Sequence, residues 1–278
     1  MEAFKNVFNK DFVVDFAHKI NKFDKSFQKD EYIIHIMKNL DKQELKERMR
    51  ALSSSINSFS SINYKDMIKV LINVKKNMNY NESISLSSMV LPDYVEVYGL
   101  NDLNISLIAL EEFTKNSSSE LAIRHFIKKF EYETMNQMLL WAKSSDEHIR
   151  RLASEGCRPR LPWAIALNAF KKNPSKVFEV IEILKNDEFL YVRKSVANNL
   201  NDISKDNPHL LIHVAKQYLG QSPNVDWVIK HACRGLLKAG DKNVLPLFGY
   251  TDAKHVQVKN FKSDSEVEGG EKLNFEFD

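Results

Sequence analysis

The stretch YVRKSVANNLND, residues 191–202, carries the pattern from which the fold can be predicted. Similar stretches lie on either side of it, HIRRLAS at 148–154 and WVIKHACRGLL at 227–237. When Ile149, Val192 and Val228 are aligned, the spacings are 43 and 36 residues. Helix pairs that repeat about every 40 residues are typical of HEAT-like solenoids. We therefore predict an all-α superhelix of stacked helix pairs, because one pair alone cannot bury its apolar face.

Amphipathic segments stand before two of these stretches and complete the expected pairs. Asn207 followed by Pro208 predicts a helix start, and Gly240 predicts a helix end. Further helices are expected near 11–23, 30–50, 65–76 and 103–115, with loops or caps at 53–63 and 79–88. The apolar residues at positions i, i+3, i+4 and i+7 of the paired segments are Val177, Val180, Ile181 and Leu184, then Leu211, Val214, Ala215 and Tyr218.

Composition agrees with a soluble helical protein. The 278 residues include only 8 glycines and 7 prolines, fewer than a turn-rich β-sandwich or α/β fold needs. No apolar run approaches the roughly 18 residues of a membrane span. The N-terminus has no uninterrupted apolar core and no cleavage site, so we do not expect a signal peptide. Cys157 and Cys233 show no paired spacing, which indicates a reducing compartment. We expect a cytoplasmic protein.

The last part of the sequence differs from the rest. Residues 255–278, HVQVKNFKSDSEVEGGEKLNFEFD, alternate apolar and polar side chains around a Gly–Gly turn, as strands do. A lone hairpin of this size is marginally stable in water. We therefore divide the chain into a helical domain, residues 1–250, and a short strand-like tail, residues 251–278.

Basic residues are in excess in the repeat region. Residues 147–240 hold 15 Lys and Arg against nine Asp and Glu, which is compatible with a polyanionic partner. In the repeat alignment Arg150 matches Arg193, and Lys194 matches Lys230. Equivalent positions of a solenoid line up along one surface, so these residues predict a basic stripe on the concave face. Ion pairs between repeats explain them equally well.

The segment RRLASEGCRPRLPW, residues 150–163, gathers unusual side chains in one corner. Arg150, Arg151, Arg158 and Arg160 surround Glu155, and Trp163 closes the loop. An ion pair of Glu155 with Arg151 and a core position for Trp163 are the simple alternatives to a functional site. Asparagines are poor helix formers, so those in 198–201 predict either a polar face near a ligand or a ladder of hydrogen bonds between repeats. These asparagines are Asn198, Asn199 and Asn201.

Four motifs resemble the DNA alkylation-repair glycosylases of the AlkD/AlkC superfamily, in its AlkC-like branch. The motifs are SSSELAIRHFI (117–127), EHIRRLASEGCRPRLPWA (147–164), YVRKSVANNLNDISKDNP (191–208) and WVIKHACRGLLKAGD (227–241). They place the resemblance at roughly 110–250. It implies a solenoid whose concave face holds duplex DNA, and hydrolysis of the N-glycosidic bond of cationic bases such as 3-methyladenine, extending in AlkC-like members to 3-methylcytosine. It also implies that residues 251–278 begin an incomplete immunoglobulin-like domain.

The resemblance assigns roles to individual residues. Glu120, Glu155 and Asp202 match the acidic catalytic positions, and Arg151 and Trp163 match positions that face the DNA and the lesion. Around them we expect a basic frame that keeps phosphates beside the carboxylates, formed by Arg150, Arg151, Arg158 and Arg160 and extended by Arg193 and Lys194.

The implied reaction suits carboxylates. A base that already carries a positive charge leaves without protonation, and the sugar acquires oxocarbenium character. Negative charge beside C1′ and a positioned water are what catalysis needs. No metal or organic cofactor is required, and the eight histidines show no metal spacing. A π-face such as Trp163 favours a cationic base over a neutral one. We expect a monomer that initiates base excision repair on alkylated duplex DNA.

Two other functions remain open from the sequence. A non-catalytic HEAT-like module that binds DNA or a protein would keep the basic stripe without needing the acidic residues. A purely structural scaffold would show no salt-dependent DNA binding at all.

Overall fold

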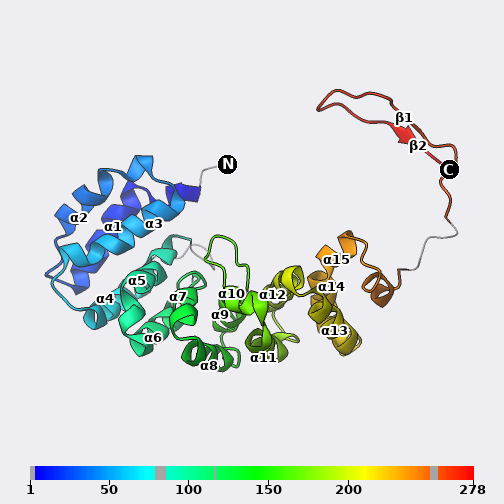
Figure 1. Cartoon of the computed structure of the whole chain (residues 1–278). Helices are drawn as coiled ribbons and strands as arrows, with labels where there is room; N and C mark the ends of the chain where they lie inside the picture. Colours follow the sequence, from blue (N-terminus) through cyan, green and yellow to red (C-terminus); the bar gives the residue numbers. More distant parts are fainter. Residues whose placement is uncertain (1–3, 79–85, 116, 251–255) are drawn as a thin grey trace.

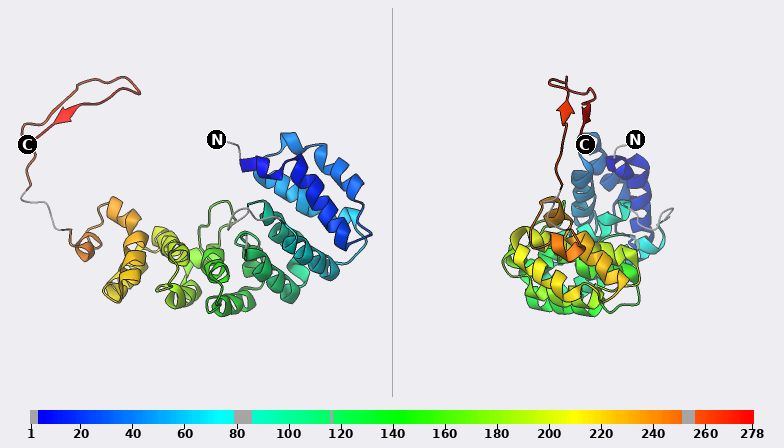
Figure 2. Two further views of the ribbon diagram at one scale, coloured as in Figure 1. Left: turned by 180° about the vertical axis from the view of Figure 1, so that it is seen from behind. Right: turned by 90° about the vertical axis from the view of Figure 1, so that its right-hand side faces the viewer.

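The structure is a computed structural model that describes residues 4–78, 86–115, 117–250 and 256–278. Within these ranges the helices stack side by side into an arch, with the first helices at one end and α15 toward the other (Figures 1 and 2). No helix in the described ranges is long and apolar enough to cross a membrane.

The first part of the arch runs to residue 114. Its helices are η1 (Phe4–Phe8), α1 (Lys10–Phe23), α2 (Lys29–Met37), η2 (Leu40–Lys42), α3 (Leu45–Ser55), η3 (Ile56–Phe59), α4 (Tyr64–Lys76), η4 (Ser87–Met89), α5 (Val90–Tyr98), η5 (Gly99–Asn101) and α6 (Leu103–Thr114).

The second part contains the predicted repeats. Its helices are α7 (Ile123–Lys129), α8 (Glu131–Trp141), α9 (Glu147–Gly156), α10 (Asn168–Lys172), α11 (Ser175–Leu184), α12 (Leu190–Asp206), α13 (Pro208–Tyr218), α14 (Pro223–Ala232), α15 (Arg234–Lys238) and η6 (Leu245–Phe248).

The predicted helix pairs are confirmed. The first two stretches that set the repeat length lie in α9 and α12, and the third begins in α14 and continues into α15. Helix α12 packs between α9 and α14. Their partners α8, α11 and α13 lie on the outer side of the arch (Figure 1). Pro208 is the first residue of α13, and Gly240 follows α15 with a φ of +70°, as the start and stop signals indicated. The all-α superhelix is therefore the observed fold.

The N-terminal part departs from the prediction in three places. The single helix expected near 30–50 is two helices, α2 and α3, because Glu44 caps a new start: Glu44 and Glu47 form reciprocal side-chain-to-backbone bonds. The expected loop at 53–63 is mostly helical, since α3 runs to Ser55 and η3 follows. Helix α5 was not predicted. Of the expected loop at 79–88, residues 79–85 lie outside the described ranges.

Close packing explains the glycine at the end of α9. The helix begins at the side chain of Asp146, which accepts bonds from two backbone N–H groups, and it ends at Gly156. A Cβ atom on Gly156 would lie 2.7 Å from a methyl of Ile123 and 2.9 Å from the Cε of Met138. Glycine therefore lets α9 approach α7 and α8 closely, which sets the position of the loop that follows.

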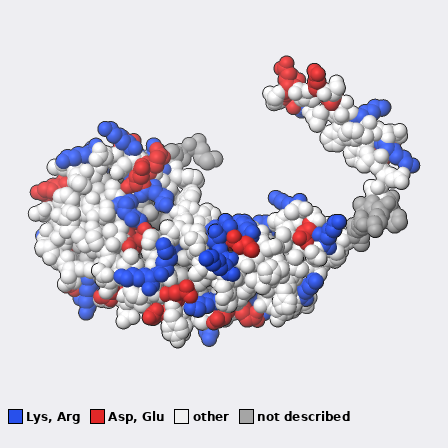
Figure 3. All heavy atoms as spheres, viewed as in Figure 1, with Lys and Arg blue, Asp and Glu red and all other residues white. Residues whose placement is uncertain are grey.

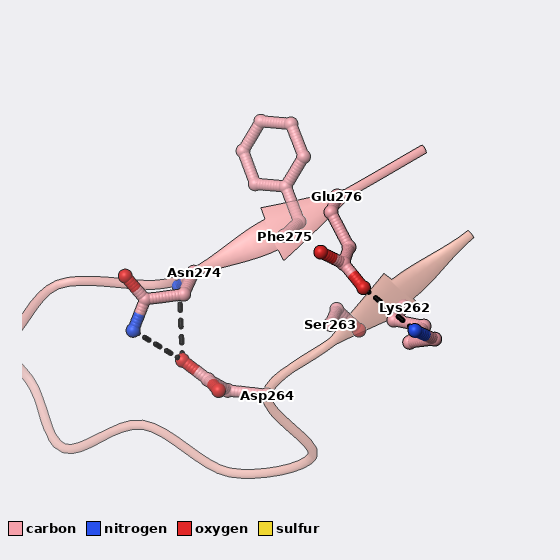
Figure 4. A pocket seen from close by; sticks show the side chains of 6 residues that line it. All are labelled: Lys262, Ser263, Asp264, Asn274, Phe275 and Glu276. Atoms are coloured by element: carbon pink, nitrogen blue, oxygen red, sulfur yellow. Dashed lines mark hydrogen bonds and ion pairs between the residues drawn. The ribbon is translucent and has the colours of Figure 1, made fainter. Parts of the chain in front are cut away.

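The tail forms the predicted hairpin, but a small one. Strands β1 (Lys262–Ser263) and β2 (Phe275–Glu276) pair antiparallel, and all the residues described after 255 are exposed. Figure 4 shows the cross-strand contacts: Lys262 pairs with Glu276 at 2.7 Å, and the Asn274 amide donates to Asp264 at 3.0 Å. The boundary predicted at 250/251 adjoins residues 251–255, which lie outside the described ranges.

Candidate active site

Two acidic side chains from neighbouring repeats meet on one arginine. Glu155 lies near the end of α9 and Asp202 lies on α12, and the structure leaves only 6% and 2% of these residues exposed. Arg158 joins them: its Nη1 donates to Glu155 Oε1 at 2.6 Å and its Nε donates to Asp202 Oδ2 at 2.8 Å. Burial works to lower the pKa of Arg158, but the charges of both carboxylates outweigh it and leave the pKa raised.

The third predicted acid joins the same cluster through Arg151. Glu120 lies in the turn before α7, and its Oε2 is 2.8 Å from Arg151 Nη1. Arg151 Nη2 is 3.8 Å from Glu155 Oε1, and the guanidinium lies over the ring of Tyr191 at 5.0 Å. Glu120, Glu155 and Asp202, hereafter the acidic cluster, are thus connected by two arginines, as one network across three segments far apart in the sequence.

The acidic cluster keeps capacity to bind more. Ser195 donates to Glu155 Oε2 at 2.5 Å, and Lys205 donates to Asp202 Oδ1 at 3.0 Å. An ionised carboxylate offers about four acceptor sites, so these bonds do not use all the acceptor sites of Glu155 or Asp202. Among the described residues, no group of three or more His, Cys, Asp or Glu is arranged to hold a metal ion.

Trp163 is not a core residue. Its side chain is 61% exposed, which removes the simple alternative of a buried position. It lies in the loop 157–167 between α9 and α10, which rises on the inner side of the arch (Figure 1). The other two tryptophans differ: Trp141 is buried and bonded to Glu111, and Trp227 is half-buried and stacks on His231.

Two of the predicted frame arginines have a shared role inside the protein. Arg150 Nη1 donates to the carbonyls of Ser144 and Ser145, and Arg193 Nη1 donates to those of Asp187 and Glu188. In both cases the acceptors lie six and five residues before the arginine. The repeat alignment therefore matched two arginines that occupy structurally equivalent positions.

Arg150 also ties one repeat to the next. Its Nε lies 2.6 Å from a carboxylate oxygen of Asp187, and both partners are nearly buried. Asp187 stands in the turn before α12, so this ion pair joins α9 to the following repeat. Of the two explanations for the matched arginines, this geometry favours the inter-repeat contact for Arg150.

Of the other frame residues, Arg158 is nearly buried between Glu155 and Asp202, whereas Arg160 and Lys194 present more charge to solvent. Arg160 makes a two-pronged pair with Asp206 at 2.6 and 2.7 Å, and its side chain is 39% exposed. Lys194 is exposed on α12. Lys and Arg residues, with Asp and Glu residues among them, gather near the middle of the inner curve of the arch (Figure 3).

Of the two explanations for the asparagines of α12, their contacts match the ladder of hydrogen bonds between repeats. Asn199 Nδ2 donates to the Ser154 carbonyl at 2.8 Å, toward α9. On the other side, Asn201 donates to the Ala232 carbonyl at 2.8 Å, and Asn198 accepts from Arg234 at 3.0 Å. These polar side chains therefore fix α12 between both neighbours.

Sequence reasoning missed several residues of this region. Ser195 and Tyr191 lie in a quoted motif, four residues apart on α12, where they face Glu155 and Arg151. Arg124 is fully buried and donates to three carbonyls of the loop region. Burial lowers the pKa of Arg124 to about 10. An arginine inside a helix that ends in Lys128 and Lys129 gives no signal in the sequence that it is buried.

A curved stack of helix pairs, in which arginines join carboxylates from neighbouring repeats, is a helical-repeat architecture of the HEAT-like kind (Figure 1). The chain belongs to the DNA alkylation repair enzyme family, whose model matches residues 48–236. This match, from α3 to α15, begins earlier than the 110–250 that the motifs indicated.

Two relatives support this membership. The chain is 41% identical over 279 residues to the uncharacterised protein YhaZ of Bacillus subtilis (strain 168), covering all of this chain and 77% of that protein. It is also similar to the Pseudomonas fluorescens alkylpurine DNA glycosylase AlkC, solved bound to DNA that contains an abasic site analog. That structure is 32% identical, with a TM-score of 0.84 over all of this chain and 76% of the other.

Proposed function

We propose that the chain is a DNA glycosylase that hydrolyses the N-glycosidic bond of cationic alkylated bases in duplex DNA and so initiates base excision repair. The observation that carries the proposal is the acidic cluster: three carboxylates from three segments, bridged by Arg151 and Arg158. The exposed Trp163 stands in the loop that follows α9. The similarity to an alkylpurine glycosylase bound to DNA supports the same activity. We take 3-methyladenine as the first substrate and 3-methylcytosine as the second.

In the proposed reaction the bond between C1′ and the base nitrogen breaks, and its electron pair neutralises the cationic base. The sugar is left with oxocarbenium character. Glu155 and Asp202 stabilise this positive charge, with Glu120 assisting, and a carboxylate with a free acceptor site orients water for attack at C1′. The attacking water loses its proton to that carboxylate, which returns it to solvent. The protein groups that act in this scheme are the side chains of Glu120, Glu155 and Asp202.

The surroundings of the cluster fit a DNA ligand. Phosphates repel carboxylates, so basic side chains must hold the DNA backbone beside the acidic cluster. Arg160 and Lys194 are the frame residues with exposed side chains and are our first choice for phosphate contacts. Trp163 offers its π-face to a cationic base, worth about 0.5–2 kcal/mol. The proposal assigns these functions to residues 1–250 of a monomer and leaves 251–278 as the start of an immunoglobulin-like domain.

The test is the release of labelled methylated bases from methylated duplex DNA. Asp202→Asn and Glu155→Gln remove a charge but little volume, and each is expected to lower the rate by about 10²–10⁴-fold. Asp187→Asn is the matched control, because it also breaks a nearly buried arginine pair, yet lies outside the acidic cluster. It should cost stability and leave the rate of the folded protein near that of the parent.

Either outcome is informative. Loss in both cluster variants with activity kept in the control supports the proposed chemistry. If the parent binds DNA in a salt-dependent way but releases no base, the chain is a binding module and the proposed reaction is wrong.

A further inference from the structure

Trp163 projects from the protein on a backbone conformation that its own residue type disfavours. Its φ is +66°, in the left-handed region. It follows Pro162 in a tight turn, closed by a 3.4 Å bond from the Ala164 N–H to the Leu161 carbonyl. Glycine is the usual residue at the third position of a turn with proline second and a positive φ third. A tryptophan keeps this conformation only where surrounding contacts hold it.

Arg124 of α7 holds the base of the loop that carries this turn. Its Nη1 donates to the carbonyls of Gly156 and Arg158 at 3.0 and 2.6 Å, and its Nε donates to that of Ile165 at 2.7 Å. The acceptors stand on both arms of the loop, so one buried side chain clamps the arms together. Its Nη2 is buried without a hydrogen-bond partner among the described residues. The buried Arg124 guanidinium thus makes its hydrogen bonds to backbone carbonyls of the loop region.

Lys46 of α3 holds the tip. Its Nζ donates to the carbonyl of Trp163 at 2.7 Å, across 117 residues of sequence. The bond acts on the very residue that has the positive φ, and it comes from the N-terminal part of the arch. Since the tryptophan side chain is mostly exposed, backbone contacts such as this one, more than side-chain packing, determine where the ring points.

We propose that Arg124 and Lys46 are positioning residues that hold loop 157–167 at its base and its tip and thereby aim the Trp163 ring at the bound DNA. The holding of the ring is a property of the protein alone. Its effect on base excision rests on the proposed function.

The first test reads the ring directly, without DNA. The full chain is labelled with 5-fluorotryptophan, and its three fluorine signals are recorded by NMR, with Trp163→Phe identifying the relevant one. Arg124→Lys and Lys46→Met are expected to shift or broaden the Trp163 signal and leave the Trp141 and Trp227 signals in place. Lys46→Arg, which can still donate to the carbonyl, should restore the parent signal.

Matched controls separate positioning from general damage. Arg48, on α3 two residues after Lys46, is also nearly buried and donates to three carbonyls, those of Lys5, Phe8 and Gln43. None of these acceptors lies in loop 157–167. Arg48→Lys should lower the melting temperature as Arg124→Lys does and leave the Trp163 signal unchanged. Lys65→Met, at an exposed first-turn position of α4, is the control for Lys46→Met.

The second test uses activity. Each positioning variant should lower kcat/KM on methylated duplex by about three- to tenfold, the effect of one hydrogen bond. The salt dependence of binding to undamaged duplex should stay the same, because a lost phosphate contact would reduce its slope by about one.

Three results would overturn the inference. An unchanged Trp163 signal in both variants means that the two residues do not hold the ring. A moved signal with parental kcat/KM means that the ring position does not matter to excision. A reduced salt slope for Lys46→Met makes that lysine a phosphate ligand instead. An inactive parent with a moved signal refutes the proposed function and leaves the holding role intact.

Discussion

Replacing Arg158 by methionine tests whether two members of the acidic cluster, Glu155 and Asp202, depend on one cation. The change keeps an apolar stem and removes the bonds at 2.6 Å to Glu155 and 2.8 Å to Asp202. Both carboxylates are nearly buried, so their charges would be left poorly compensated. Removing one partner of a buried ion pair costs about 3–5 kcal/mol. At roughly 2–4 °C per kcal/mol for a chain of this size, the melting temperature should fall by about 6–20 °C.

The assay is thermal unfolding followed by circular dichroism at pH 8. Adding Glu155→Gln and Asp202→Asn to the variant removes the unpaired charges and should recover much of the loss. Arg160→Met, at a partly exposed pair, is the control, with an expected cost of about 0–1 kcal/mol.

A loss under about 2 °C at pH 8 would refute this reasoning. So would a triple variant no more stable than Arg158→Met alone, because the cost would then come from lost packing and not from stranded charge.

Three further predictions can be tested by thermal unfolding or by labelling with a thiol reagent. Gly156→Ala should destabilise by about 1–3 kcal/mol, because its Cβ would lie 2.7 Å from Ile123; a raised melting temperature, as expected for a simple helix position, would show that α7 can move aside. Asn199→Ala should cost about 1–3 kcal/mol by removing the amide donor from the buried Ser154 carbonyl, which also accepts from the Cys157 thiol at 3.4 Å; an unchanged melting curve would show that the asparagine ladder does not stabilise the stack. Burial raises the pKa of the Cys157 thiol to about 12, so a thiol reagent at pH 8 should label it only after unfolding; rapid labelling of the native protein would contradict its buried position.

The repeats could be predicted because their signals are local and periodic. The alignment of Arg150 with Arg193 needed only spacing, and both side chains donate to equivalent carbonyls. The start of α3 could not be predicted in the same way. Its cap is Glu44, whereas Ser, Thr, Asp and Asn are the residues that mark a helix start in a sequence.

The candidate site likewise contains residues that the sequence could reveal and residues that it could not. The motifs brought out the members of the acidic cluster, and the structure places them in one network. Lys46 could not be found, because 117 residues separate it from the carbonyl that it contacts and a surface lysine has no distinguishing pattern. Arg124 had no signal either, since its partners are backbone carbonyls, which are present at every residue and leave no trace in the sequence.

The position of α12 between two neighbours has a consequence for how the protein comes apart. In a one-dimensional stack each unit is stabilised mainly through its nearest neighbours, so the interfaces behave like links of a chain. Asn199 stabilises the interface between α12 and α9, and Asn201 stabilises the interface between α12 and α14. Weakening both should divide unfolding into two separate transitions, one for the helices before α12 and one for those after it. Glu155 lies on α9 and Asp202 lies on α12. The acidic cluster would therefore come apart when the interface between α9 and α12 opens, before the helices on either side of it had unfolded.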